Sequence, residues 1–271
     1  MTTHRSYANP PLVLALLEIR HPATDYLTRG DIASLKQALV GVAPLHKEEN
    51  VTEYQFMIHP NAAPLSRPSS KVNHRFLKRD RQTSITFGTD FIKVETTAYQ
   101  HWTGIKNLAE AAINARLNIS DVDGIERIGI RLVDEIRVPE TGSQPQWDKW
   151  VSPKLLAPDF SADHLSQVQQ QSVIQYEMRE EGQTLTLSYG AVNGPPAVGS
   201  IENLIRANNP GPGHYFLLDT DVAWSPAAGQ SVPEFRPEHV LQVADSLHEP
   251  MSTLFEQLIS DSLREEVLHS V

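Results

Sequence analysis

The chain has 271 residues, of which 40% are hydrophobic, 21% charged and 7% aromatic, the proportions of an ordinary folded protein. A chain of this length buries roughly 70 to 75% of its unfolded surface, so a full hydrophobic core can form. It has no cysteine, which excludes disulfides, thiolate metal sites and cysteine nucleophiles and favours a reducing compartment.

The net charge of −10 is unevenly divided. Residues 1–140 carry 17 Lys+Arg and 16 Asp+Glu, whereas residues 141–271 carry 6 and 17. An acidic second half repels phosphate backbones and suits either a solvated face or a basic partner. The apolar run at 12–17 is too short for a signal peptide or a membrane span. We expect a cytoplasmic protein with no membrane contact.

The first half predicts a strand, a short helix, several strands, a longer helix and a strand. Alternating apolar residues indicate strands at 12–20, 51–59, 74–79, 83–87, 91–99 and 125–138. Helical spacing indicates helices beginning at Asp31, as N-cap, and over 102–117. Prolines at 60, 64 and 68 predict a loop over 61–70. In the last strand Ile128, Ile130, Leu132 and then Asp134 share one face.

The second half begins after a predicted linker at 141–158, which separates domain 1–140 from domain 159–271. We expect a helix at 160–171, a hairpin of 172–179 and 183–192, and a strand at 215–224. A Gly- and Pro-rich stretch at 190–213 is irregular, with a short helix at 201–207. Pro237 begins a long amphipathic helix that Pro250 should kink. The fold class is α+β, mostly antiparallel sheet with amphipathic helices packed on one face, either as one duplicated domain or as two closely packed, related halves.

No catalytic or cofactor motif is present. Eleven His are scattered without metal-ligand spacing, and the serine elbow, phosphate loop and dinucleotide fingerprint are missing. Asp219 and Asp221 share a strand face and are weak metal candidates, because a third ligand is not evident. The sequence therefore predicts no cofactor and favours a non-catalytic protein.

Two sets of basic residues could bind an anion. Lys71, Arg75, Lys78, Arg79 and Arg81 form a basic strip that could follow a nucleic-acid backbone, although a strand would split its charge between two faces. Arg127 and Arg131 share one face of a strand. They either form a polar network with Glu18 or Asp134 or together bind an anion.

An ordered set of short motifs runs along most of the chain. It comprises Asn9-Pro10-Pro11, the segment from Asp90 to Tyr99 and Trp102, Arg127-Ile128-Gly129-Ile130-Arg131, Leu218-Asp219-Thr220-Asp221, and Leu247-His248 with Phe255. This set resembles a sporadically distributed family of uncharacterised prokaryotic proteins. Asp134 stands where that family is expected to have a polar residue such as Asn. The resemblance implies no reaction; patchy occurrence suggests accessory, defence or antitoxin-like roles.

Most of these motif residues suit structural roles. Asn9, Pro10 and Pro11 fix an extended entry, Tyr99 and Trp102 anchor a helix on its sheet, and Gly129 allows a close approach. Three functions remain open. The first is a non-catalytic binding protein, with a protein partner and a homodimer expected; the second is nucleic-acid binding or processing through the basic strip. The third is a small-molecule sensor with 190–213 as a lid over a pocket.

Overall fold

The computed structural model describes residues 7–57, 65–139, 145–158, 168–199, 204–227 and 229–269. One antiparallel sheet of nine strands has the order β2-β3-β4-β5-β1-β6-β9-β8-β7. The strands are β1 (Leu12–Arg20), β2 (Leu45–Met57), β3 (Leu65–Leu77), β4 (Thr83–Phe87), β5 (Phe91–Thr96), β6 (Arg127–Ile136), β7 (Ser172–Glu177), β8 (Gln183–Gly194) and β9 (Gly213–Trp224). The predicted α+β class is confirmed.

Strand β1 lies at the centre of the sheet, between β5 and β6. Its alternating sequence places Ala15, Leu17 and Ile19 on the buried face, and Leu17 and Ile19 are fully buried. The opposite face carries Glu18 and is partly exposed. A period of two therefore determines which side of the sheet receives the helices.

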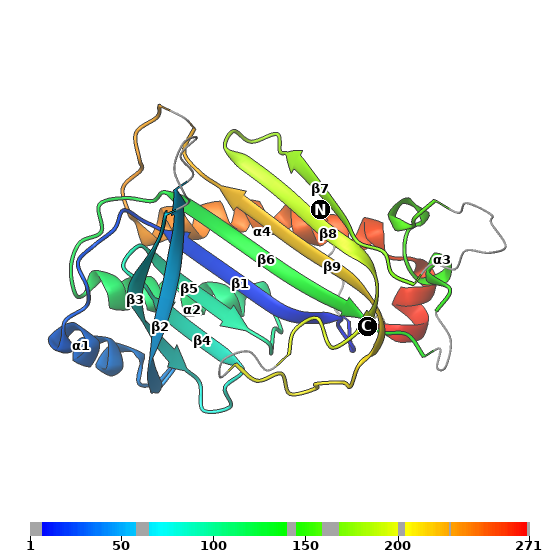
Figure 1. The fold of residues 1–271 in the computed structure, drawn as a ribbon, viewed down its shortest axis with the longest axis horizontal. Coiled ribbons are helices and arrows are strands. Elements are labelled where there is room, and N and C mark those ends of the chain that lie inside the picture. The colour runs from blue at the N-terminus through cyan, green and yellow to red at the C-terminus, as the bar shows by residue number, and fades with distance from the viewer. Residues whose placement is uncertain are drawn as a thin grey trace.

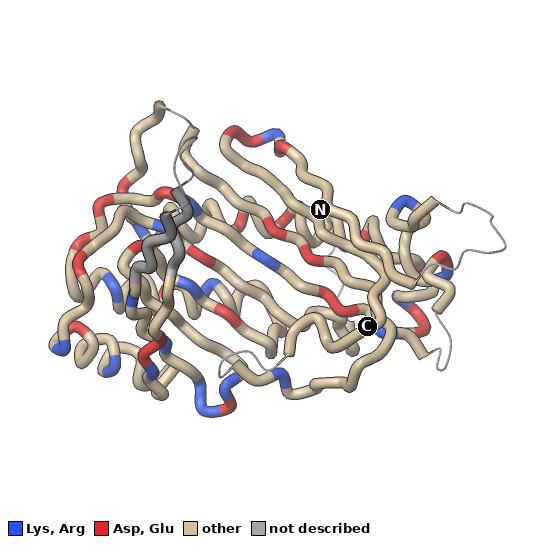
Figure 2. Tube along the Cα trace, viewed as in Figure 1, with Lys and Arg blue, Asp and Glu red and all other residues tan. Residues whose placement is uncertain are grey.

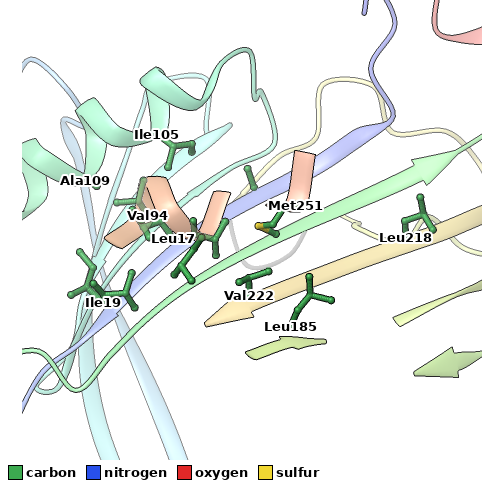
Figure 3. Close-up of a cluster of buried hydrophobic side chains, with 14 of the residues drawn as sticks. Leu17, Ile19, Val94, Ile105, Ala109, Leu185, Leu218, Val222 and Met251 are labelled. Carbon is green, nitrogen blue, oxygen red and sulfur yellow. The ribbon is translucent and has the colours of Figure 1, made fainter. Parts of the chain in front are cut away.

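Two long helices cover that buried face. Helix α2 (Trp102–Leu117) and helix α4 (Pro237–Leu258) both lie behind the sheet in Figure 1. Figure 3 shows Ile105 of α2 and Met251 of α4 meeting strand residues such as Leu17 and Val222. Among the described residues, no helix is long and apolar enough to cross a membrane.

Both halves of the chain contribute to this one sheet. Strand β6 of the first half pairs with β9 of the second along nine residue pairs, from Ile128–Trp224 to Ile136–Phe216. Between the halves, helix α3 (Trp147–Trp150) places Trp147 and Trp150 in the hydrophobic core. The segment predicted as a linker thus carries core residues.

Helix α1 (Arg29–Leu39) begins earlier than the sequence suggested. Thr28, not Asp31, is the N-cap: the Thr28 hydroxyl accepts a hydrogen bond from the Asp31 amide, and the Asp31 carboxylate accepts one from the Thr28 amide. Asp31 therefore occupies the third helical position of a capping box.

Other local predictions differ from the structure over the residues that it describes. Strand β3 already includes 65–70, where a loop was predicted. Of the helix predicted at 160–171, residues 160–167 lie outside the described residues and 168–171 are not helical. Of 201–207, residues 204–207 are likewise not helical and 201–203 are not described. Helix α4 begins at Pro237 as predicted and continues through Pro250.

Candidate functional site

A cavity of about 780 Å³ opens on the helix-covered side of the sheet. Its walls come from the N-terminal segment, β6, β9, the start of α2 and one side of α4. The lining residues include Tyr7, Pro10, Pro11, Leu12, Tyr99, Gln100, His101, Trp102, Thr103, Leu132, Asp134, Thr220, His248, Met251, Ser252, Phe255 and Glu256. We call it the Asp134 cavity.

Asp134 is the acidic residue that the sheet itself contributes to the cavity. It pairs with Leu218 of β9 and with Leu12 of β1, where the β1–β6 register shifts, and it lies on the helix-facing side together with Leu132. Asp134 as a whole is only 8% exposed to solvent. No hydrogen bond or ion pair joins this carboxyl to any of the described residues.

The surroundings of Asp134 raise the pKa of its carboxyl. Burial, and secondly the charge of Asp219, raise the pKa of its carboxyl to about 7. Desolvation penalises the charged form, and no Lys or Arg among the described residues compensates for it. Near neutral pH the carboxyl is therefore poised between its two forms.

Aromatic side chains from α2 and α4 form another wall. The rings of Trp102 and His248 stack with 4.3 Å between centroids and 6° between planes. The Trp102 indole N–H donates to Asp245 Oδ1 at 2.7 Å, which fixes the ring. Tyr99 Oη lies 3.5 Å from His248 Nε2, and burial, then the charge of Asp134, raise the pKa of Tyr99 to about 12.

The second carboxylate of the cavity, Glu256, is paired within the protein. The Tyr7 hydroxyl donates to Glu256 Oε1 at 2.7 Å, and Arg264 Nε donates to Glu256 Oε2 at 3.0 Å. Burial, and then Glu256, raise the pKa of Tyr7 to about 12. Glu256 is thus neutralised by Arg264, in contrast to Asp134.

The N-terminal Asn-Pro-Pro segment is held by the end of the chain. The Asn9 amide donates to the Leu268 carbonyl at 3.0 Å, and Asn9 Nδ2 donates to the Val267 carbonyl at 3.2 Å. The Glu135 amide donates to the Pro11 carbonyl at 2.9 Å. These contacts place Pro10 and Pro11 at the cavity wall.

On the opposite face of the sheet, basic and acidic residues of β6 and β9 form pairs, and Figure 2 shows charged positions along these strands. Arg131 binds Asp219 through two hydrogen bonds, of 2.8 and 2.6 Å. Arg127 lies 3.5 Å from Glu18 and 3.3 Å from Asp221. Glu18, not Asp134, completes this network, because Asp134 lies on the other face.

Gly129 makes room for the Arg127 side chain. A Cβ atom at Gly129 would lie 2.5 Å from Arg127 Nη1, so the close approach expected at this glycine is made by the guanidinium. Asp219 and Asp221 are both committed to arginines. No group of three His, Asp or Glu residues that could hold a metal occurs among the described residues.

The basic strip is divided by the fold. Arg75, only 6% exposed, contacts Glu49 at 3.0 Å and Glu95 at 3.3 Å within the sheet. Lys71 Nζ lies 3.8 Å from Asp90. Lys78, Arg79 and Arg81 follow β3 in its turn toward β4, where the Arg81 amide donates to the Lys78 carbonyl. The five cations do not form one continuous basic surface.

The Asp134 cavity brings together residues that the sequence named for other reasons. Pro10, Pro11, Tyr99 and Trp102 were expected to be structural, and His248 and Phe255 were noted only as parts of a motif. Thr220 was noted only as part of a motif. Tyr7 and Glu256 were not singled out, because nothing local marks a residue whose neighbours come from distant segments.

Comparison with known proteins adds no assignment: no protein-family model matches the chain, and neither does any curated protein.

Proposed function

We propose that the protein binds a small organic molecule in the Asp134 cavity, as a non-catalytic sensor or carrier. The observation that carries this proposal is Asp134, a residue only 8% exposed, whose carboxyl lacks a partner among the described residues and lines a cavity of about 780 Å³. This volume lies within the range of protein sites for small molecules, roughly 300 to 1,000 Å³.

An unpaired buried carboxyl is costly to the folded state. Removing such a group from water without a compensating bond costs on the order of several kcal/mol when it is ionised. Groups of this kind concentrate at functional sites, where a ligand supplies the missing partner. The mixed lining, with aromatic rings beside a few polar groups, is typical of a site that binds and orients an organic molecule.

The stretch at 190–213 was expected to act as a lid over a pocket. Arg206 and residues 207–210 line a second cavity of about 610 Å³, which shares Pro10, Pro11 and Leu12 with the Asp134 cavity. No described residue of 190–213 lines the Asp134 cavity. The proposal therefore does not depend on a lid.

The other two hypotheses stay predictions. The first is a protein partner, with a homodimer or an antitoxin-like role. Nucleic-acid binding would now have to rely chiefly on Lys78, Arg79 and Arg81, because Arg75 is buried between carboxylates. Replacing these three by serine should abolish salt-dependent binding to DNA or RNA if that activity exists.

The proposal is tested by exposing the purified protein to the small-molecule fraction of a cell extract and identifying retained molecules by mass spectrometry. Thr103, exposed at the rim of the cavity, can be replaced by Trp to obstruct it. Glu110→Trp, at an exposed position of α2 outside the cavity, is the matched control. We expect wild type and Glu110→Trp to retain one compound at about one molecule per chain, and Thr103→Trp to lose it. Retention of nothing by wild type, or of the same compound by Thr103→Trp, contradicts the proposal.

A further inference from the structure

We infer that the Asp134 cavity selects organic cations, with an ammonium group placed beside Asp134 and against the aromatic wall. This inference rests on the proposed function and adds the chemical class of the ligand.

The charge balance of the lining favours a cationic ligand. Asp134 and Glu256 are the acidic residues in the cavity wall, and none of the described lining residues is Lys or Arg. Arg264 neutralises Glu256 from outside the wall. Asp134 therefore leaves one carboxylate without a counter-charge, and a buried carboxylate is stabilised most by a cation within about 4 Å.

The aromatic composition of the remaining wall also favours a cationic ligand. Tyr7, Tyr99, Trp102 and Phe255 all line the cavity, and the faces of such rings carry negative potential that attracts cations. Tyr99 lies close enough to Asp134 for the carboxylate charge to act on its hydroxyl. Aromatic rings grouped around one acidic residue are a common solution for recognising ammonium groups.

One feature of the cavity favours the opposite charge. Trp102 and Thr103, the first residues of α2, reach the lining, and the N-terminus of a helix attracts anions. The effect of a helix terminus is equivalent to about half a charge, whereas Asp134 carries a full one when ionised. An anionic probe is nevertheless required to compare the two.

Three probes of the same shape separate these possibilities. Choline is cationic, 3,3-dimethylbutan-1-ol is its neutral counterpart and 3,3-dimethylbutanoate is anionic. Binding to the full chain can be measured by isothermal calorimetry at pH 8. We expect choline to bind with a Kd at least about tenfold lower than the alcohol, and the anion to bind more weakly than either.

Asp134→Asn should remove this preference. The amide keeps the shape of the side chain without its charge, so choline and the alcohol should bind the variant within about twofold of each other. Thr103→Trp should weaken both, whereas Glu110→Trp should weaken neither. Binding of the alcohol to Asp134→Asn shows that the cavity of the variant is intact.

The pH dependence gives a further readout. For wild type, choline affinity should fall by about tenfold from pH 8 to pH 6 as Asp134 takes up a proton. The other titratable groups facing the cavity are Tyr7, Tyr99, His101, His248 and Glu256, and Asp219 acts through the sheet. Protonation of His101 or His248 would also disfavour a cation, so the part of the effect lost in Asp134→Asn is the part assigned to Asp134.

The possible failures are distinguishable. If the alcohol or the anion binds wild type as tightly as choline, the inference is wrong and the proposed function stands. If choline keeps its preference in Asp134→Asn, Asp134 is not the cation site and the inference is also wrong. If no probe binds wild type, and the compound retained from the extract carries no cationic group, selection of cations is again refuted. Only failure of the extract experiment removes the proposed function itself.

Discussion

Asp134→Asn should stabilise the folded protein at alkaline pH and leave its stability unchanged at acid pH. The pKa of Asp134 is raised from 3.8 to about 7 in the folded state. Between these values the folded chain holds a proton that the unfolded chain has released. The stability of wild type therefore falls as pH rises through this window, and the loss is complete above about pH 7.

The magnitude follows from the size of the shift. A difference of about three pH units corresponds to about 4 kcal/mol at 25 °C. This figure is an upper limit, because water entering the cavity solvates part of the charge. Asn resembles the protonated form of Asp, so the variant should gain up to this amount at pH 8 and almost nothing at pH 4.

Urea unfolding followed by circular dichroism, at several values between pH 4 and pH 8, measures the difference between the two proteins. Other carboxylates titrate in both proteins and cancel in the comparison. Asp121→Asn, at an exposed position between α2 and β6, removes one charge at the surface and serves as the control. A stability difference that does not change with pH, or a variant less stable than wild type at pH 8, would refute the assignment of Asp134 as a buried, unpartnered carboxyl.

Two further predictions concern positions outside the cavity. The fully buried Glu135 side chain accepts hydrogen bonds from Arg206 at 2.8 Å, Arg137 at 2.6 Å and the Ala197 amide at 2.7 Å. Burial alone would raise the pKa of Glu135, but these hydrogen bonds outweigh burial and lower the pKa. Glu135→Gln should therefore cost about 3 kcal/mol at pH 7, with the penalty shrinking as pH falls through the lowered pKa, measured by the same unfolding series; no loss at pH 7 would contradict it. Gly182→Ala should lower the free energy of unfolding by about 2 kcal/mol, measured by thermal unfolding, because φ at Gly182 is +77° and a Cβ would lie 2.2 Å from the Ser225 carbonyl oxygen. Gly104 has open space around it, so Gly104→Ala should be neutral or stabilising by up to about 1 kcal/mol. Equal effects of the two substitutions would disprove this reasoning.

Local sequence patterns located the central elements well. Strand β1, strand β4 and helix α2 have the predicted bounds, because alternation or helical spacing is uninterrupted in each. A proline precedes β1 and a glycine follows β4. The loop predicted at 61–70 failed over 65–70. Pro68 lies where β3 pairs with β2 alone, and a residue without an amide proton is tolerated where a strand has a neighbour on one side only.

The candidate site was less accessible to sequence reasoning, since its parts are far apart in the chain. Tyr7 contacts Glu256 across 249 positions and Trp102 contacts Asp245 across 143. The strand pattern did place Asp134 on the same face as Ile128 and Ile130. The pattern could not show whether a basic side chain would pair with Asp134 on that face, because this depends on which helices cover the face.

Asp134 and Glu135 illustrate what the fold adds to such a pattern. They are neighbours in β6 and both are buried, yet their pKa values move in opposite directions. Glu135 faces the side of the sheet where Arg137 and Arg206 meet it, whereas Asp134 faces the helices. Pairing allows a buried carboxylate to remain charged without a large penalty, and its absence makes the same group costly. The arginines Arg137 and Arg206 compensate the charge of Glu135, whereas Asp134 is left facing a cavity. We therefore propose ligand recognition at Asp134 and a structural role for Glu135.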